Sequence, residues 1–364
     1  VRDLVTANLL HPTTAKIFQR GKDQSPTELG TDLRLYRHQV DAIEVARTGR
    51  PYVVTTGTGS GKSLTYIVPI VDHVLRHGTG RGVQAIIVYP MNALANSQLG
   101  ELDKFLGFGF GGKAPVRVRR YTGQESHDER RAIVEDPPDI LLTNYVMLEL
   151  ILTRRHEQGL VQGAKDLRYL VFDELHTYRG RQGADVAMLV RRVRERMGGD
   201  ALQCIGTSAT MSSDGGLAER RRAVADVASR MFGVPVLMDD VIGETLQRVT
   251  ADVDADDPNF GTRLRSSLDR LDDLIAERYE SFVQDPLCGW IETQVGVRPD
   301  PVEGVLVRST PRRLIGDDGM AADLARLTGV TESDAAAALR RLLLAGYEKR
   351  DPSPDGVGAP AFAF

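Results

Sequence analysis

The segment PYVVTTGTGSGKSLTYIVPIVDHVL (residues 51–75) contains the pattern that decides the fold. A β-branched strand pattern at 52–55 leads into a glycine-rich loop at 56–63, and a helical pattern follows the loop. Glycines allow the backbone N–H groups of such a loop to turn inward, and the N-terminus of the helix behind them adds positive charge. This order of strand, loop and helix predicts a binding site for the phosphates of a nucleotide.

The polar residues of the loop are those that phosphate binding requires. Lys62 supplies a mobile cation, and the hydroxyl of Ser63 is suited to bind Mg²⁺. Thr56 stands where the general pattern has glycine. We expect the phosphates to be held by Thr56, Gly57, Thr58, Gly59, Ser60, Gly61, Lys62 and Ser63. A glycine-rich surface turn is the alternative, which a strand and a helix on the correct sides disfavour.

A second apolar strand pattern, at residues 169–172, ends in two adjacent acids, Asp173 and Glu174. The carboxyl ends of parallel strands meet at one sheet edge, where the phosphate loop is also expected. Asp173 is then expected to hold Mg²⁺, and Glu174 to orient and polarise the attacking water. A solvated acidic pair at a strand end is the ordinary alternative. Together with the loop, the pair predicts hydrolysis of ATP with Mg²⁺ as cofactor.

The rest of the chain suggests how the domains are divided. Short apolar runs alternate with helical patterns from about Leu33 to Val236, which predicts a three-layer α/β domain with a parallel sheet. The strands are expected at 52–55, 84–89, 116–121, 140–143, 169–173 and 203–208. The segment at 250–261 is acidic and rich in turn-forming residues, so the alternation of strand and helix patterns ends before it. We therefore expect an N-terminal extension at 1–32, the α/β domain at 33–238, and a mainly helical accessory region at 239–364.

Composition excludes several classes of protein. The chain has 364 residues, 41% of them hydrophobic, and its 46 Lys and Arg against 50 Asp and Glu leave a net charge of −4. No apolar run approaches the roughly 20 residues that span a bilayer. The two cysteines, Cys204 and Cys288, lie far apart, which supports neither a disulfide framework nor a zinc site. The first 20 residues lack the apolar block of a signal peptide, so a cytoplasmic location is expected.

Over about residues 30–215 the chain resembles the first RecA-like domain of superfamily 2 helicases of the DEAD/DEAH-box group. Leu35 to Gln39 is similar to the Q motif of these helicases, and the resemblance implies nucleotide binding by Tyr36, Arg37 and Gln39. The amide of Gln39 can donate and accept at once, as N6 and N7 of adenine require. The acids followed by His176 form a DExH sequence, in which His176 takes the position that couples hydrolysis to movement. Two further coupling residues, from the segment similar to motif III, are Ser208 and Thr210.

Three further segments are similar to the nucleic-acid motifs of the family: residues 90–98, 121–123 and 142–145. The resemblance implies sequence-independent contacts with the sugar–phosphate backbone from Pro90, Asn92, Ala93, Thr122, Gly123, Thr143 and Asn144. Each segment alone could be an ordinary turn or helix cap. Residues 177–183, TYRGRQG, are similar to the MrfA-type and DISARM-like DNA helicases. This likeness implies single-stranded DNA as partner, a role in DNA repair or phage defence, and protein partners in a larger complex.

The C-terminal third shows no segment similar to the Q-x-x-G-R-x-x-R arginine-finger motif of the second RecA-like domain. Residues 320–347 instead predict a helix-turn-helix, with a winged helix as one form that it could take. The element is either a DNA-reading element or a structural insertion, and we expect the insertion. The chain is expected to be a fragment that ends before the second domain. The main hypothesis is the N-terminal motor half of an ATP-dependent DNA helicase or translocase, an ATP hydrolase whose full activity is expected to need a second RecA-like domain. The alternatives are a nucleotide-dependent DNA-binding module without turnover, and an ATPase acting on other substrates, which would lack the three nucleic-acid segments.

Overall fold

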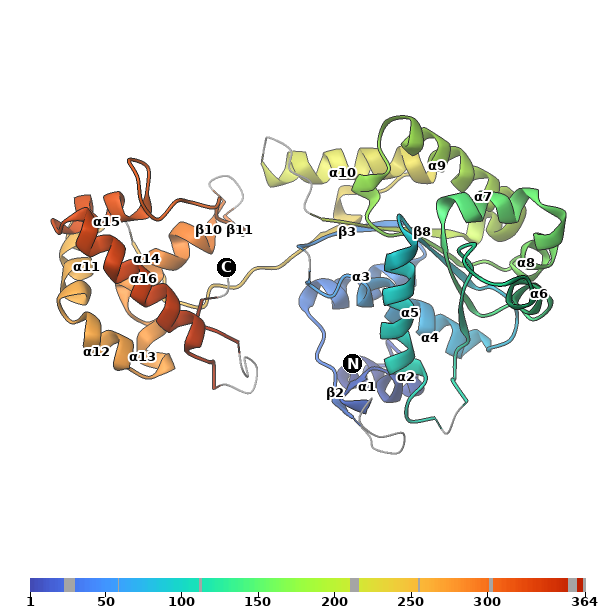
Figure 1. Cartoon of the computed structure of the whole chain (residues 1–364), viewed down its shortest axis with the longest axis horizontal. Helices are drawn as coiled ribbons and strands as arrows, with labels where there is room; N and C mark the ends of the chain where they lie inside the picture. The colour runs from blue at the N-terminus through green and yellow to red at the C-terminus, as the bar shows by residue number, and fades with distance from the viewer. Residues whose placement is uncertain are drawn as a thin grey trace. The chain divides into compact units, whose positions relative to one another are not determined.

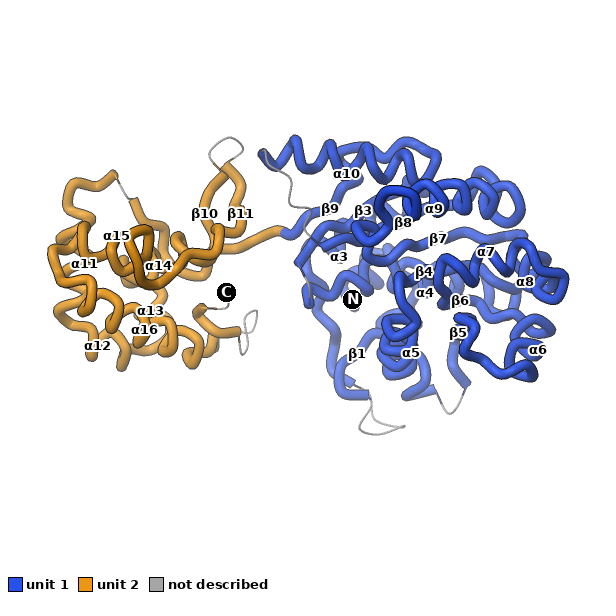
Figure 2. The backbone as a smooth tube through the Cα atoms, turned by 45° about the horizontal axis from the view of Figure 1, so that its top comes forward, with its two compact units in different colours: residues 1–244 blue, residues 245–364 orange. Residues whose placement is uncertain are grey.

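The computed structural model describes residues 1–22, 30–57, 59–110, 113–209, 216–254, 256–300, 304–352 and 359–362. Contacts divide the chain into two compact units, unit 1 (Val1–Glu244) and unit 2 (Thr245–Phe364), which Figure 2 distinguishes by colour. Unit 1 contains the phosphate loop and the acidic pair, so it carries the candidate site. Unit 2 has a hydrophobic core of its own.

A parallel sheet of seven strands forms the centre of unit 1 (Figure 1). The strand order is β5-β6-β4-β7-β8-β3-β9, and every neighbouring pair runs parallel. The predicted parallel α/β sheet is confirmed, because all six expected strands lie in it. The strands are β3 (Tyr52–Thr55), β4 (Ala85–Tyr89), β5 (Val118–Arg120), β6 (Ile140–Asn144), β7 (Tyr169–Phe172), β8 (Gln203–Ser208) and β9 (Val241–Gly243).

The edge strand β9 is absent from the strands expected from the sequence. It follows residue 238, where the α/β domain is expected to end, and it pairs with β3 from Val53 to Thr55. Three residues are too few to show a strand periodicity, so pairing with the neighbouring strand defines this element. The N-terminal segment is part of unit 1, because Ile17 and Phe18 are buried in the same core as residues of the sheet. That segment contains α1 (Arg2–Thr6), α2 (Pro12–Ile17) and the paired strands β1 (Gln19–Arg20) and β2 (Thr31–Asp32).

Helices cover both faces of the sheet, and residues along each strand alternate between two cores. The α-helices around the sheet are α3 (Arg37–Thr48), α4 (Leu64–His77), α5 (Asn92–Leu106), α6 (His127–Glu135), α7 (Tyr145–Thr153), α8 (Gln158–Gly163), α9 (Gly180–Val193) and α10 (Leu217–Phe232). In β3, Val53 belongs to the core beneath α7, α8, α9 and α10, whereas Tyr52 and Val54 belong to the core beneath α3, α4 and α5. The helix α4 continues through Pro69, as the resemblance implies.

Gly206 in β8 offers a test of this packing. A Cβ added there would lie 2.2 Å from Cδ1 of Leu175 and 3.3 Å from Cζ of Phe232. We expect Gly206→Ala to lower the free energy of unfolding by about 1–3 kcal/mol, measured by urea denaturation. Gly100→Ala in the exposed part of α5 is the matched control, since a Cβ there meets open space and should stabilise the helix by up to about 1 kcal/mol. Wild-type stability of Gly206→Ala would contradict this packing.

Unit 2 is mainly helical, as predicted, with one short hairpin of β10 (Val297–Pro299) and β11 (Leu306–Arg308). Its helices are α11 (Phe260–Asp269), α12 (Leu271–Ala276), α13 (Tyr279–Val283), α14 (Pro286–Val295), α15 (Met320–Thr328) and α16 (Glu332–Glu348). A short turn with Gly329 at φ +74° joins α15 to α16, and the hydroxyl of Thr331 caps α16. In the described ranges of both units, no helix combines the length and the apolar character that crossing a membrane requires.

Candidate functional site

The phosphate loop connects β3 to α4 at the carboxyl edge of the sheet. Gly59 and Gly61 have φ angles of +77° and +73°, in the left-handed region that a side chain disfavours. The helix α4 begins at Leu64, so its N-terminus lies directly behind the loop and faces it with positive partial charge. Thr58 lies outside the described residues. The described part of the loop thus has the backbone form that phosphate binding requires.

Lys62 and Thr56 are held from within the loop. The ammonium of Lys62 donates to the carbonyl of Thr56 at 3.1 Å and lies 3.6 Å from Oε1 of Glu174. The hydroxyls of Thr56 and Ser60 hydrogen-bond to each other at 2.6 Å, and Thr56 is fully buried. The threonine at the glycine position therefore fits without disturbing the loop. Lys62 thus connects the phosphate loop with Glu174 of the acidic pair.

The segment before β3 packs against the phosphate loop. Nε2 of Gln39 donates to the carbonyl of Gly61 at 2.9 Å, and Oε1 of Gln39 accepts from the backbone N–H of Tyr36. An amide has four hydrogen-bonding positions, and these two bonds use two of those of Gln39, whose side chain is buried. Tyr36 is exposed and stacks on His38, which lies 3.2 Å from the carbonyl of Ser60 through Nε2. His38, which was not predicted to be part of the site, thus also supports the loop.

Asp173 follows β7 and is almost completely buried. Its Oδ1 accepts a hydrogen bond from the hydroxyl of Thr207 at 2.5 Å. The two strands bring these residues together, because Phe172 of β7 pairs with Gly206 of β8. Burial and the neighbouring charge of Glu174 raise the pKa of Asp173 to about 6 although Thr207, Lys62 and His176 lower it. Thr207 was not predicted to be a site residue.

The backbone of Glu174 turns sharply at φ +54° and ψ +56°, a left-handed conformation that is uncommon outside glycine. Its backbone N–H donates to the hydroxyl of Thr207 at 3.1 Å. The carboxylate lies between Lys62, which is 3.6 Å from Oε1, and His176, whose Nδ1 is 3.2 Å from Oε2. The N–H of Ala209 also donates to Oε2, at 3.3 Å. The turn therefore directs Glu174 toward the phosphate loop and fixes its orientation.

Two groups at this edge fit a magnesium ion. Burial raises the pKa of Asp173 even with Lys62 and His176 nearby, and a divalent cation would add positive charge that stabilises the ionised carboxylate. Ser63 precedes α4, does not cap the helix with its side chain, and brings a hydroxyl oxygen to the same edge. Oxygen ligands of these two kinds are those that Mg²⁺ prefers.

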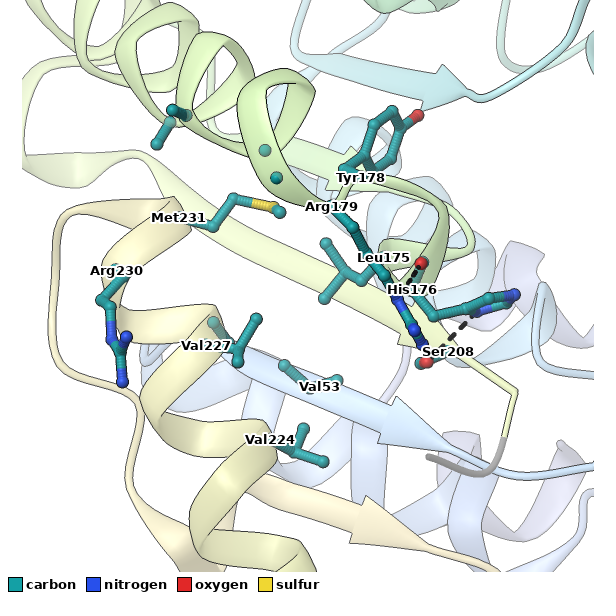
Figure 3. Close-up of a pocket in the computed structure, with 15 residues that line it drawn as sticks. Val53, Leu175, His176, Tyr178, Arg179, Ser208, Val224, Val227, Arg230 and Met231 are labelled. Atoms are coloured by element: carbon teal, nitrogen blue, oxygen red, sulfur yellow. Dashed lines mark hydrogen bonds between the residues drawn. The ribbon is translucent and has the colours of Figure 1, made fainter. Parts of the chain in front are cut away.

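The segment after Glu174 leads to a second, apolar feature. Nδ1 of His176 lies 3.3 Å from the hydroxyl of Ser208, and both residues reach the rim of a pocket of about 610 Å³ between α9 and α10 (Figure 3). Most residues that line the pocket are apolar, among them Val53, Val224 and Met231. None of the phosphate-loop residues that the structure describes lines this pocket, which distinguishes it from the candidate nucleotide site. Thr210, expected beside Ser208, lies outside the described residues.

The three segments expected to bind nucleic acid meet at the ends of β4, β5 and β6. Nδ2 of Asn144 donates to Oδ1 of Asn92 at 2.7 Å and to the carbonyl of Thr122 at 3.2 Å. The hydroxyl of Thr143 donates to the carbonyl of Tyr121 at 2.7 Å. Oδ1 of Asn144 also caps α7. The two asparagines and the two threonines thus link the three loops into one surface.

Pro90 and Ala93 bring no polar side chain to this surface, and both flank Asn92 at the start of α5. Gly123 is exposed, whereas Thr122 is buried and directs its N–H and hydroxyl to the carboxylate of Glu125. The backbone donors of this loop therefore point inward in the structure. Glu125 was not predicted to be part of the site, since nothing in its sequence neighbourhood marks it.

Residues 36–215 of the chain match the DEAD/DEAH box helicase family. The Druantia protein DruE of Escherichia coli is 26% identical in an alignment 326 residues long. This alignment includes 57% of this chain and 18% of DruE. The uncharacterized ATP-dependent helicase YprA of Bacillus subtilis is 32% identical over 189 residues, or 51% of this chain and 24% of YprA. The chain thus spans about a quarter or less of the length of these two relatives.

Among solved structures, the DUF1998 helicase MrfA bound to DNA resembles the chain with a TM-score of 0.50 and 24% identity. The match covers 65% of this chain and 30% of the MrfA chain. At this identity the likeness concerns the fold. The expected RecA-like fold and the expected likeness to DEAD/DEAH-box and MrfA-type helicases are confirmed.

Proposed function

We propose that this chain, whose residues 36–215 form a DEAD/DEAH box helicase domain, carries the ATP-hydrolysing motor domain of a DNA helicase or translocase. One observation carries the proposal. Lys62 of the phosphate loop and Glu174 after β7 lie 3.6 Å apart, at the same edge of the sheet as the three linked loops. A nucleotide site and a strand-binding surface on one rigid sheet edge are what a nucleic-acid motor requires.

Hydrolysis follows from the roles of the residues at this edge. The backbone N–H groups of the phosphate loop and the ammonium of Lys62 bind the β- and γ-phosphates. Ser63 and Asp173 would hold Mg²⁺, which neutralises phosphate charge when it is bound. Glu174 orients the attacking water and accepts its proton, while His176 holds the carboxylate from the opposite side.

Strand binding is assigned to the surface formed by residues 90–93, 122–123 and 143–144. Amides, hydroxyls and backbone groups of this kind hold a sugar–phosphate backbone without reading its sequence. DNA is the favoured strand, because the similar MrfA structure was solved with DNA. Single-stranded DNA is the expected form, because the flexible backbone of a single strand can lie along these loops.

Unit 2 is assigned an accessory role rather than a strand-reading one. Residues 245–364 contain 14 Lys and Arg against 21 Asp and Glu, whereas residues 1–244 contain 32 against 29. Binding to DNA phosphates depends on clustered positive charge, so this acidic balance disfavours DNA binding by α15 and α16. The helix-turn-helix then serves as a structural insertion.

ATP turnover by the 364-residue chain, measured with and without single-stranded DNA, tests the proposal. We expect the DNA to raise turnover and Lys62→Ala to abolish it, with RNA of equal length stimulating less. ATP turnover that changes neither on addition of DNA nor in Lys62→Ala would contradict the motor assignment. ATP binding without turnover in the presence of DNA would contradict hydrolysis by this chain while leaving the nucleotide site intact.

A further inference from the structure

The carboxylate of Glu125 is the centre of the loop that contains Thr122 and Gly123. Its Oε1 accepts from Nε of Arg120 at 2.7 Å and from the hydroxyl of Thr122 at 3.1 Å. Its Oε2 accepts from the backbone N–H groups of Thr122 at 2.8 Å and Gly123 at 2.9 Å. Four donors from residues 120–123 thus converge on one side chain, which is only 6% exposed.

These contacts keep the carboxylate ionised. Burial alone would raise the pKa of Glu125, but hydrogen bonds from Arg120 and from the backbone N–H groups of Thr122 and Gly123 lower it below the usual value. A protonated or amide side chain would bring a donor to a position where all four neighbours already donate. The network therefore requires a carboxylate.

The loop adopts its turn around this anion. Gly123 has a φ angle of +90°, which lets its N–H point in the same direction as that of Thr122. Two successive N–H groups directed at one anion form a backbone concavity of the kind that also binds phosphate. Here Glu125 fills that concavity, so the exposed positions of the loop are Gly123 itself and Gln124.

The same carboxylate is connected to the neighbouring segments. Arg120 extends from Glu125 to Oδ1 of Asn96 in α5, at 2.5 Å, and Nδ2 of Asn96 lies 3.4 Å from Oε1 of Gln124. The carbonyl of Thr122 accepts from Asn144 at the end of β6. Through these bonds Glu125 connects all three strand-binding segments, although its own side chain is buried.

We propose that Glu125 is a positioning residue for nucleic-acid binding, whose carboxylate shapes the Thr122–Gly123 loop and holds it against α5 before a strand arrives. The inference rests on the proposed function, since it concerns the same surface. Glu125 makes no contact with the strand itself. Its effect is to present Gly123 and Gln124 outward and to spare the strand the cost of ordering the loop.

Binding of labelled single-stranded oligo-dT, followed by fluorescence anisotropy, tests the inference with the 364-residue chain. Glu125→Ala is expected to weaken binding about tenfold, because it leaves Arg120 and three other donors without their acceptor. The atoms that this substitution removes correspond to acetate. We therefore expect sodium acetate, compared with sodium chloride at equal ionic strength, to restore most of the lost affinity. Salt must be matched because strand binding depends on it.

Glu135→Ala is the matched control, since Glu135 is exposed at the end of α6 and its removal changes the net charge equally. Affinity for an ATP analogue and the midpoint of thermal unfolding check that Glu125→Ala folds. Weaker binding that acetate restores supports the inference. Unchanged or tighter oligo-dT binding by Glu125→Ala would overturn it, and so would a loss that acetate does not restore. Failure of the wild-type chain to bind oligo-dT would instead overturn the proposed function.

Discussion

Glu174→Gln is expected to slow ATP hydrolysis by at least about 100-fold while ATP stays bound. Glutamine keeps the size of the side chain, and its carbonyl oxygen can still accept from Lys62 or from the N–H of Ala209. An amide cannot take up the proton of the attacking water, so the chemical step loses its base. Lys62 and the backbone of the phosphate loop are unchanged, which preserves nucleotide affinity.

Single-turnover hydrolysis of labelled ATP with single-stranded DNA present measures this effect, and filter retention of the nucleotide measures binding. Glu101→Gln is the control, because Glu101 is exposed on α5 and pairs only with Lys104 on the surface among the described contacts. We expect the control to hydrolyse ATP as the wild type does. Hydrolysis by Glu174→Gln at the wild-type rate would show that Glu174 is not the base of the hydrolysis step.

Lys62→Ala is expected to weaken ATP binding by about 100-fold. The ammonium of Lys62 is nearly buried between the carbonyl of Thr56 and the carboxylate of Glu174. Alanine removes the one side-chain cation that the loop offers to the phosphates. It also leaves the negative charge of Glu174 facing the γ-phosphate, so repulsion adds to the lost attraction.

Titration with a fluorescent ATP analogue in the presence of Mg²⁺ gives the affinity of each variant. Lys165→Ala is the control, since Lys165 is exposed in the segment before β7 and its loss changes the net charge equally. Thermal unfolding of Lys62→Ala shows whether the loss of the contact between Lys62 and Glu174 alters stability. Equal nucleotide affinity of Lys62→Ala and the wild type would mean that ATP binds elsewhere.

The features that the sequence predicts well are those set by neighbouring residues. The strand, glycine loop and helix from Tyr52 to His77 form a continuous segment, and all three are present in the structure. Helix α4 even continues through Pro69, where helix propensity alone predicts an end and only the family resemblance predicts continuation. The apolar run at 169–172 that ends in acids predicts a strand end, and in the structure Asp173 and Glu174 directly follow β7.

The features that the sequence does not reveal depend on residues far apart in the chain. Thr207 meets Asp173 only because β7 and β8 pair in one particular register. His38 reaches the phosphate loop across 22 positions, and β9 is defined by its pairing with β3. Glu125 is close in sequence to Thr122, yet its role depends on a turn that residue types alone do not specify.

Simultaneous binding of nucleotide and strand tests the central claim most directly, because the claim assigns them to different parts of one sheet edge. Labelled oligo-dT is titrated with the 364-residue chain, with and without a saturating non-hydrolysable ATP analogue and Mg²⁺. The account predicts a complex that holds both ligands, in which the nucleotide leaves the oligo-dT affinity unchanged or increases it. Displacement of oligo-dT by the nucleotide would contradict it, since strand phosphates would then occupy the phosphate loop.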